Sequence, residues 1–236
     1  MRTLIDQERF EMEILDRLHS ARLLSVLIFY GGTMLRLCHG LDRFSVDLDF
    51  RLQKPTSGTS VLARLRSCLE PWYRITDAAE KFYTLVVELR STAYPRALKI
   101  EIRKEGTPVH TEKAIAYSPH STRQVLVTAA TLPDMMALKT RALIERKEIR
   151  DAYDIEFLLK RGIALVDDGP SLQEALETIA SFPLRHYSAK LGPLLEPAKR
   201  AYYREHNFRI LKAAVAEKLA HTPQGPSREK SAGSRP

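Results

Sequence analysis

The chain has 236 residues, 44% of them hydrophobic and 28% charged, which suits one large soluble domain or two small ones. Its longest apolar run, residues 23–30, is too short to cross a bilayer, and the first residues lack the apolar core of a signal peptide. The two cysteines stand in no metal or redox spacing, so we expect a cytoplasmic protein with no membrane partner. The net charge of +8 fits a polyanionic partner and fits a plain basic surface equally well.

The first half of the chain mixes helical and strand patterns. Apolar residues at helical spacing predict helices over residues 6–24, 33–39 and 61–70. Short apolar or alternating runs predict strands over residues 26–30, 46–52, 81–90, 98–103 and 124–128. We therefore expect an α/β (α+β) domain over residues 1–128, in which helices flank a mixed sheet.

The second half is predicted to be helical. The pattern indicates helices over residues 131–148, 150–160, 171–180 and 198–219. Residues 182–197 contain three prolines and are expected to be more loop than helix. The last residues, 221–236, carry Pro, Gly, Ser and charges without large apolar side chains, so a disordered tail is expected after a helical domain over 129–220.

The strand at residues 46–52 carries the clearest chemical signal. Apolar and charged residues alternate strictly there, so Asp47 and Asp49 lie on one face, opposite Leu48 and Phe50. Two carboxylates so close repel each other unless a cation lies between them. Hard ions such as Mg²⁺, or Mn²⁺ in its place, are held by one or two carboxylates plus substrate phosphates. The alternative is a strand whose outer face is simply charged.

A glycine pair, Gly31-Gly32, lies between a predicted strand and a predicted helix, and Thr33 follows it. Backbone N–H groups at a helix N-terminus form a natural phosphate cradle. A tight strand–helix turn also needs glycine, so the pair by itself identifies only the turn. Arg36 and Arg43 are candidate bidentate phosphate ligands, although arginines are common on protein surfaces.

These residues belong to a pattern that resembles a known family. The matching pieces are Gly31-Gly32-Thr33-x-Leu35-Arg36, His39-Gly40-Leu41-x-Arg43-Phe44-Ser45-x-Asp47-Leu48-Asp49-Phe50, Asp134-(x4)-Lys139-x-Arg141-Ala142 and Arg150-Asp151-x-x-Asp154. In order and spacing they resemble the AbiEii/AbiGii nucleotidyltransferase toxins, which belong to the superfamily with polymerase-β-like active sites. The resemblance implies a nucleotidyltransferase-like fold and a bacterial toxin of a toxin–antitoxin or abortive-infection system. It also implies Mg²⁺, a nucleoside triphosphate (NTP) substrate, an RNA acceptor with the tRNA 3′ end favoured, and an antitoxin encoded next to the toxin.

The same resemblance implies roles for individual residues. Asp47 and Asp49 would hold metal. The nucleotide would be bound by Gly31, Gly32, Thr33, Arg36 and Ser45. Glu101 is a possible third metal ligand, although an ion pair with a neighbouring lysine explains it equally well.

Two residues of the helical half would complete the site. Lys139 would offset phosphate charge, and Asp154 would order Lys139 or the acceptor hydroxyl. Asp151 and Asp134 fit the simpler explanation that acids near a helix N-terminus are favoured by the helix dipole.

The sequence is compatible with other functions. The acceptor could be a protein or a small molecule, and the chain could be a nucleic-acid-binding module without catalysis. A purely structural role conflicts with the bare Asp47/Asp49 pair. Basic residues of the second half could track an RNA backbone or form the polar face of a helical bundle: Lys190, Lys199, Arg200, Arg204, Arg209 and Lys212.

Overall fold

The computed structural model describes residues 1–53, 56–166 and 168–221 of the chain, so nearly all of the predicted tail lies outside it. The first part contains α1 (Arg2–Ser20), β1 (Leu27–Tyr30), α2 (Gly31–His39), β2 (Asp47–Leu52), α3 (Gly58–Leu69), β3 (Arg74–Glu80), β4 (Thr84–Arg90), β5 (Leu98–Arg103), β6 (Thr111–Tyr117) and β7 (Gln124–Ala130). A short 3-10 turn, Leu24–Val26, precedes β1. The predicted mixture of helices and strands is confirmed.

The strands form one seven-stranded mixed sheet in the order β3-β4-β5-β2-β1-β7-β6. The central strand β2 runs antiparallel to β1 and parallel to β5. Leu48 and Phe50 are fully buried on one face of β2, as the alternating pattern predicted. On the buried face, α1 packs against α3 and against the strands β5 and β7. The opposite face of β2 is left for the polar side chains.

Two strands, β3 and β6, have no counterpart among the predicted elements. They are the two edge strands of the sheet. Most of their residues are exposed or half-buried, so neither strand shows the apolar alternation that marks a strand with one buried face. The edge position therefore explains why the pattern was missed.

The helix α2 begins directly at the glycine pair, because the chain turns from β1 into the helix at Gly31, whose φ is +87°. It ends at Gly40, which adopts the left-handed conformation (φ 72°) that glycine accepts without steric cost. The predicted strand–turn–helix unit is present, with the helix two residues longer at its N-terminus than predicted.

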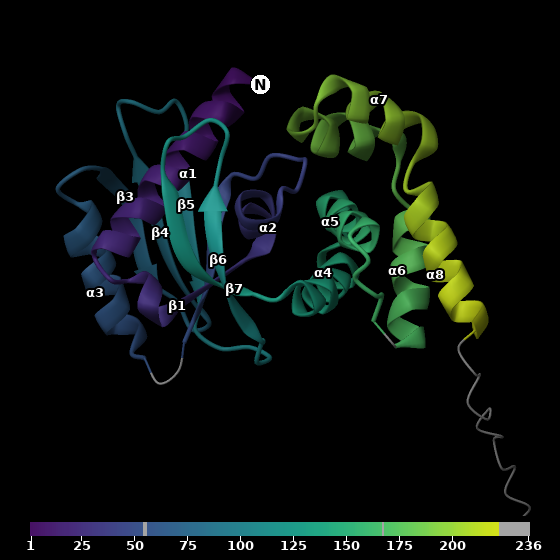
Figure 1. Ribbon diagram of the computed structural model, residues 1–236, viewed down its shortest axis with the longest axis horizontal. Helices are drawn as coiled ribbons and strands as arrows, with labels where there is room; N and C mark the ends of the chain where they lie inside the picture. Colours follow the sequence, from purple (N-terminus) through teal and green to yellow (C-terminus); the bar gives the residue numbers. More distant parts are fainter. Residues whose placement is uncertain (54–55, 167, 222–236) are drawn as a thin grey trace, which may run out of the picture.

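The second part is helical, as predicted. It contains α4 (Leu132–Arg146), α5 (Ile149–Lys160), α6 (Gly169–Ala180), α7 (Pro197–His206) and α8 (Arg209–His221). Figure 1 shows these helices gathered on one side of the molecule, with the sheet, α1 and α3 on the other. Among the described residues, no helix combines the length and the apolar character that crossing a membrane needs.

Two predictions for the helical part were wrong. Residues 186–194 form a π-helical segment (His186–Leu191) and a 3-10 turn (Gly192–Leu194). The prolines that suggested a loop mostly flank this segment and do not interrupt it. The predicted helix over 198–219 is two helices, because Asn207 adopts a φ of 52° and turns the chain so that Phe208 is fully buried.

Candidate active site

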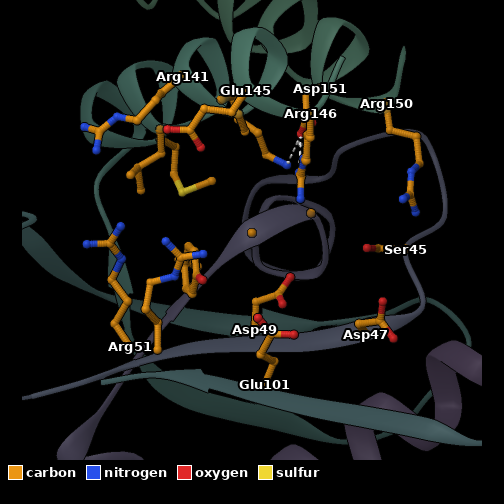
Figure 2. A pocket seen from close by; sticks show the side chains of 18 of the residues that line it. Ser45, Asp47, Asp49, Arg51, Glu101, Arg141, Glu145, Arg146, Arg150 and Asp151 are labelled. Carbon is orange, nitrogen blue, oxygen red and sulfur yellow. Dashed lines mark hydrogen bonds and ion pairs between the residues drawn. The ribbon is translucent and has the colours of Figure 1, made fainter. Parts of the chain in front are cut away.

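A polar cavity lies between the open face of β2 and β5 and the helices α4 and α5 (Figure 2). Its lining comes from segments far apart in the sequence: the glycine turn, the loop before β2, two strands and two helices. Apart from three apolar residues of α4, the cavity is lined by Tyr30, Gly31, Gly32, Arg43, Ser45, Asp47, Asp49, Arg51, Lys99, Glu101, Arg103, Lys139, Arg141, Glu145, Arg146, Arg150 and Asp151. The cavity thus brings most of the predicted site residues together.

The floor of the cavity is built by the register of β2 and β5. Asp47 lies opposite Lys99, and Asp49 lies opposite Glu101. Residues two apart on a strand share a face, so these side chains point into the same cavity. The Lys99 Nζ lies 3.2 Å from a carboxylate oxygen of Glu101, so Glu101 is paired within the protein.

Asp47 and Asp49 are the least compensated acids of the floor. Burial, followed by the charge of Asp47, raises the pKa of Asp49 to about 6. Burial also raises the pKa of Asp47, against the opposing effect of Lys99. A divalent cation between the two carboxylates would remove this penalty, so the donor chemistry fits a hard metal ion.

The residues available to such a metal ion are few. Within the described ranges, no three His, Cys, Asp or Glu side chains are arranged to hold a metal ion together. A metal ion here would depend on Asp47 and Asp49, with substrate phosphates and water as its other ligands. Glu101 lines the cavity beside them, but its carboxylate is turned toward Lys99.

The glycine turn lies directly over the carboxylates. A Cβ atom added at Gly31 would stand 2.6 Å from Asp49 Oδ2. One added at Gly32 would stand 2.6 Å from Arg43 Nη2 and 2.9 Å from Ser45 Oγ. Any side chain would therefore displace the groups that face the cavity, and the backbone N–H groups at the start of α2 stay accessible to an anion only because both residues are glycine.

An ion-pair network in the cavity wall joins the two halves of the chain. Asp154 is fully buried and accepts two hydrogen bonds from Arg43, at 2.6 and 2.7 Å. Lys139 Nζ lies 2.6 Å from Asp154 and 3.1 Å from Asp151. Arg146 donates two hydrogen bonds of 2.7 Å to Asp151. Three cations share two carboxylates, so this side of the cavity keeps a net positive charge opposite Asp47 and Asp49.

The network changes the titration of its members. Burial alone would raise the pKa of Asp151, but Lys139 and Arg146 bring it below its ordinary value. Burial would lower the pKa of Arg43, but the charge and hydrogen bonds of Asp154 raise it. Both groups therefore stay charged. Asp151 does more than complement a helix dipole, because it holds Lys139 and Arg146 against the cavity.

Two predicted nucleotide-binding residues do not reach the cavity. Thr33 is buried, and its hydroxyl donates to the backbone carbonyl of Asp47 at 2.5 Å. Arg36 pairs with the buried Glu8, donates to the carbonyl of Leu41 at 3.1 Å and stacks on Phe44. Arg36 thus fixes the loop that carries the site residues, and Thr33 fixes the strand.

The remaining predicted residues lie outside the cavity lining. Asp154 lies one layer behind the wall, where it orders Lys139, while Asp134 contacts His110 outside the cavity. The six basic residues of the second half are also outside it. Three of them are engaged within the protein: Lys190 with Glu148, Lys199 with Asp42 and Arg200 with the carbonyl of Gly192.

Several lining residues were not predicted. Arg51 follows Asp49, and Arg103 follows Glu101, by two residues on the same strand. Residues two apart share a face, so the position of both arginines in the cavity could have been predicted from the sequence. Arg141 and Arg150 belong to the motifs that resemble the family, but no role was predicted for them. Arg146 lies outside those motifs, and nothing in its spacing distinguishes it from a surface arginine.

Two solved structures resemble this chain in fold. A crystal structure of a candidate nucleotidyltransferase from H. pylori is similar at 20% identity, with 89% of this chain and 96% of that chain covered and a TM-score of 0.57. The crystal structure of JHP933 from Helicobacter pylori is similar at 18% identity, covering 90% and 95% with a TM-score of 0.51. At such identities the likeness concerns the fold. No curated protein matches the chain.

The family comparison extends over most of the molecule. The sequence profile of the nucleotidyl transferase AbiEii toxins of type IV toxin–antitoxin systems matches residues 13–223. This range includes the glycine turn, both aspartates and the ion-pair network of α4 and α5. The chain therefore belongs to the AbiEii family of nucleotidyl transferase toxins.

Proposed function

We propose that this toxin is a Mg²⁺-dependent enzyme that transfers nucleotides from an NTP to RNA, with the tRNA 3′ end as the acceptor. Modified tRNA ends would block translation in the cytoplasm, as in abortive infection. Family membership implies an NTP substrate and a cognate antitoxin. The metal ion, the acceptor and the cellular outcome are the parts that we propose.

One observation carries the proposal. Two incompletely neutralised carboxylates, Asp47 and Asp49, face a helix N-terminus and a net positive wall across one cavity. A triphosphate with a hard cation supplies the charges that this arrangement lacks. A nucleic-acid-binding module without catalysis would have no use for acids at the floor of an anion site, because they repel phosphates.

The reaction assigned to the site is a displacement at phosphorus. The acceptor hydroxyl oxygen forms a bond with the α-phosphorus, the bond to the bridging oxygen breaks, pyrophosphate leaves, and the hydroxyl proton passes to water. When bound by Asp47 and Asp49, Mg²⁺ would neutralise charge on the phosphate oxygens. Lys139, fixed by Asp151 and Asp154, and Arg146 contribute positive charge from the opposite wall.

The test is transfer of label. The purified protein is incubated with total RNA and each radiolabelled NTP, with Mg²⁺, with Mn²⁺ or with a chelator. We expect label in the tRNA band only when a divalent ion is present. Label on protein or on a small molecule in place of RNA would overturn the acceptor assignment. Toxicity in cells that survives Asp47→Ala would show that binding without catalysis is sufficient.

A further inference from the structure

Three arginines crowd one end of the cavity. Arg51 and Arg103 are directly opposite each other on β2 and β5, and Arg141 reaches the same end from α4. Figure 2 shows Arg51 and Arg141 at one end of the cavity, with Ser45 and Arg150 at the other. We call Arg51, Arg103 and Arg141 the arginine cluster. Like charges directly opposite on neighbouring strands destabilise a sheet, so an unpaired cluster needs another explanation.

The cluster lacks an internal counter-ion among the described residues. Arg51 donates to the backbone carbonyl of Thr107, and Arg141 donates to the hydroxyl of Thr107 at 3.1 Å. The Arg103 side chain has no hydrogen bond or ion pair within the described ranges, although its backbone lies in the sheet between β2 and β4. Arg51 is only 8% exposed, and its Nε atom is buried without a hydrogen-bond partner. Two nearby acids have other partners, since Glu101 pairs with Lys99 and Asp134 contacts His110. Glu145 follows Arg141 by four residues on α4 and lines the cavity, but it forms no ion pair with the cluster in the described ranges.

A buried guanidinium with an unused donor, beside two further arginines, is a site built for an anion. Arginines bind phosphate through pairs of parallel N–H groups, and in an enclosed cavity such hydrogen bonds are strong. The reaction brings two molecules to the cavity, an NTP and an acceptor. The position of the cluster relative to Asp47 and Asp49 indicates which of these two molecules, the NTP or the acceptor, the cluster binds.

The two ends of the cavity lie on opposite sides of Asp47 and Asp49. Ser45 precedes Asp47 by two residues, and Arg51 follows Asp49 by two residues, about 7 Å further along the strand. Gly31 lies beside Asp49, and Gly32 lies beside Ser45 and Arg43. The backbone N–H groups at the start of α2, which would bind the triphosphate, therefore extend from Asp49 toward the Ser45 end. The attacking and leaving oxygens of a phosphoryl transfer lie roughly in line, on opposite sides of phosphorus. Pyrophosphate that leaves toward Ser45 therefore places the acceptor at the arginine end.

We infer that the arginine cluster binds a backbone phosphate of the acceptor strand, next to the nucleotide whose hydroxyl is extended. This inference rests on the proposed RNA acceptor and names the residues that position it. A protein or small-molecule acceptor without a phosphodiester would leave the cluster without a ligand. The cluster therefore selects for a nucleic-acid end.

The inference is tested by steady-state kinetics of Arg103→Gln with unfractionated tRNA and a labelled NTP. The Arg103 side chain has no hydrogen bond or ion pair to lose, and its charge lies opposite that of Arg51, so this variant should melt at or above the wild-type temperature. We expect its KM for tRNA to rise about tenfold, the loss of one charged hydrogen bond. The slope of log KM against log salt concentration should fall by about 0.7, the value for one phosphate contact on a single strand. The KM for the NTP should stay unchanged.

The matched control is Arg90→Gln, which removes an exposed arginine of β4 outside the cavity and should leave all constants unchanged. A raised KM for the NTP, or an unchanged KM for tRNA, in Arg103→Gln would overturn the inference while the proposed function stands. If the wild-type protein labels no RNA, the proposed function fails and the inference fails with it. The two failures are thus distinguished by the wild-type reaction.

Discussion

Arg43 and Asp154 form a bidentate ion pair, with Nε–Oδ1 at 2.6 Å and Nη2–Oδ2 at 2.7 Å, between side chains that are 4% and 0% exposed. The pair joins the loop before β2 to α5, across 111 residues of sequence. Lys139 contacts the same carboxylate, so two cations share Asp154 behind the cavity wall. Asp154 is therefore a positioning residue, and it also fixes the sheet to the helical part.

Asp154→Ala should lower the free energy of unfolding by about 3–5 kcal/mol, because removing one partner leaves buried charges uncompensated. The measurement is urea unfolding followed by circular dichroism. The control is Asp16→Ala, which breaks a partly exposed pair with Arg123 and should change stability by about 1 kcal/mol at most. Equal losses in the two variants would contradict the role assigned to Asp154.

Asp49→Asn should separate activity from stability. The amide keeps the shape of the side chain but removes a charge that burial and Asp47 both disfavour, so the melting temperature should rise. Transfer of label should fall by at least about 100-fold, because a metal ion contributes several kcal/mol of charge stabilisation. Asp77→Asn, at an exposed position of the edge strand β3, should change neither quantity. A variant that is less stable than the wild type, or that remains active, would contradict this account.

The fold was predictable wherever one face of an element is buried. The alternation of Leu48 and Phe50 with two aspartates identified β2, and Leu98–Arg103 was predicted with its observed bounds. The edge strands β3 and β6 were not predictable in this way, because their side chains are mostly exposed on both faces. The break between α7 and α8 at Asn207 could not be predicted from the sequence either, because the burial of Phe208 depends on tertiary packing.

The site was predictable where spacing along one strand carries the information. Asp47 and Asp49 share a face by that rule, and the same rule extends to Arg51. The partners of Lys139 were harder to predict from the sequence, because its contacts with Asp151 and Asp154 depend on how α4 packs on α5. The position of Arg36 on the buried Glu8 could not be read from its motif, which fixes an order of residues but not the direction of a side chain.

Gly31→Ala should lose both stability and activity. A left-handed backbone costs a residue with a Cβ atom about 1–2 kcal/mol, and the new methyl group would press on Asp49 Oδ2. Gly162→Ala is a matched control, because Gly162 has a similar φ of +78° but no atom within 4 Å of an added Cβ. Gly31→Ala should lose at least as much stability in urea unfolding as Gly162→Ala, and only Gly31→Ala should lose transfer of label. Full activity of Gly31→Ala would show that the turn tolerates displacement of Asp49.

Glu11 should make the protein less stable as the pH rises. The residue is fully buried, and neither carboxylate oxygen has a hydrogen-bond partner among the described residues. Burial and the charges of Glu8 and Asp47 raise its pKa well above 4.5, against the opposing charges of Arg36 and Arg96. The folded state therefore keeps a proton that the unfolded state releases.

Stability linked to Glu11 is accordingly full below the ordinary pKa of a glutamate and declines above it, by up to about 1.4 kcal/mol per pH unit. Glu11→Gln removes the titrating group, so its free energy of unfolding should fall less than that of the wild type between about pH 5 and 8. Glu70→Gln, at an exposed glutamate paired with Arg66, should follow the wild-type curve. Parallel curves for Glu11→Gln and the wild type, measured by urea unfolding at each pH, would show that Glu11 is ionised in the folded protein.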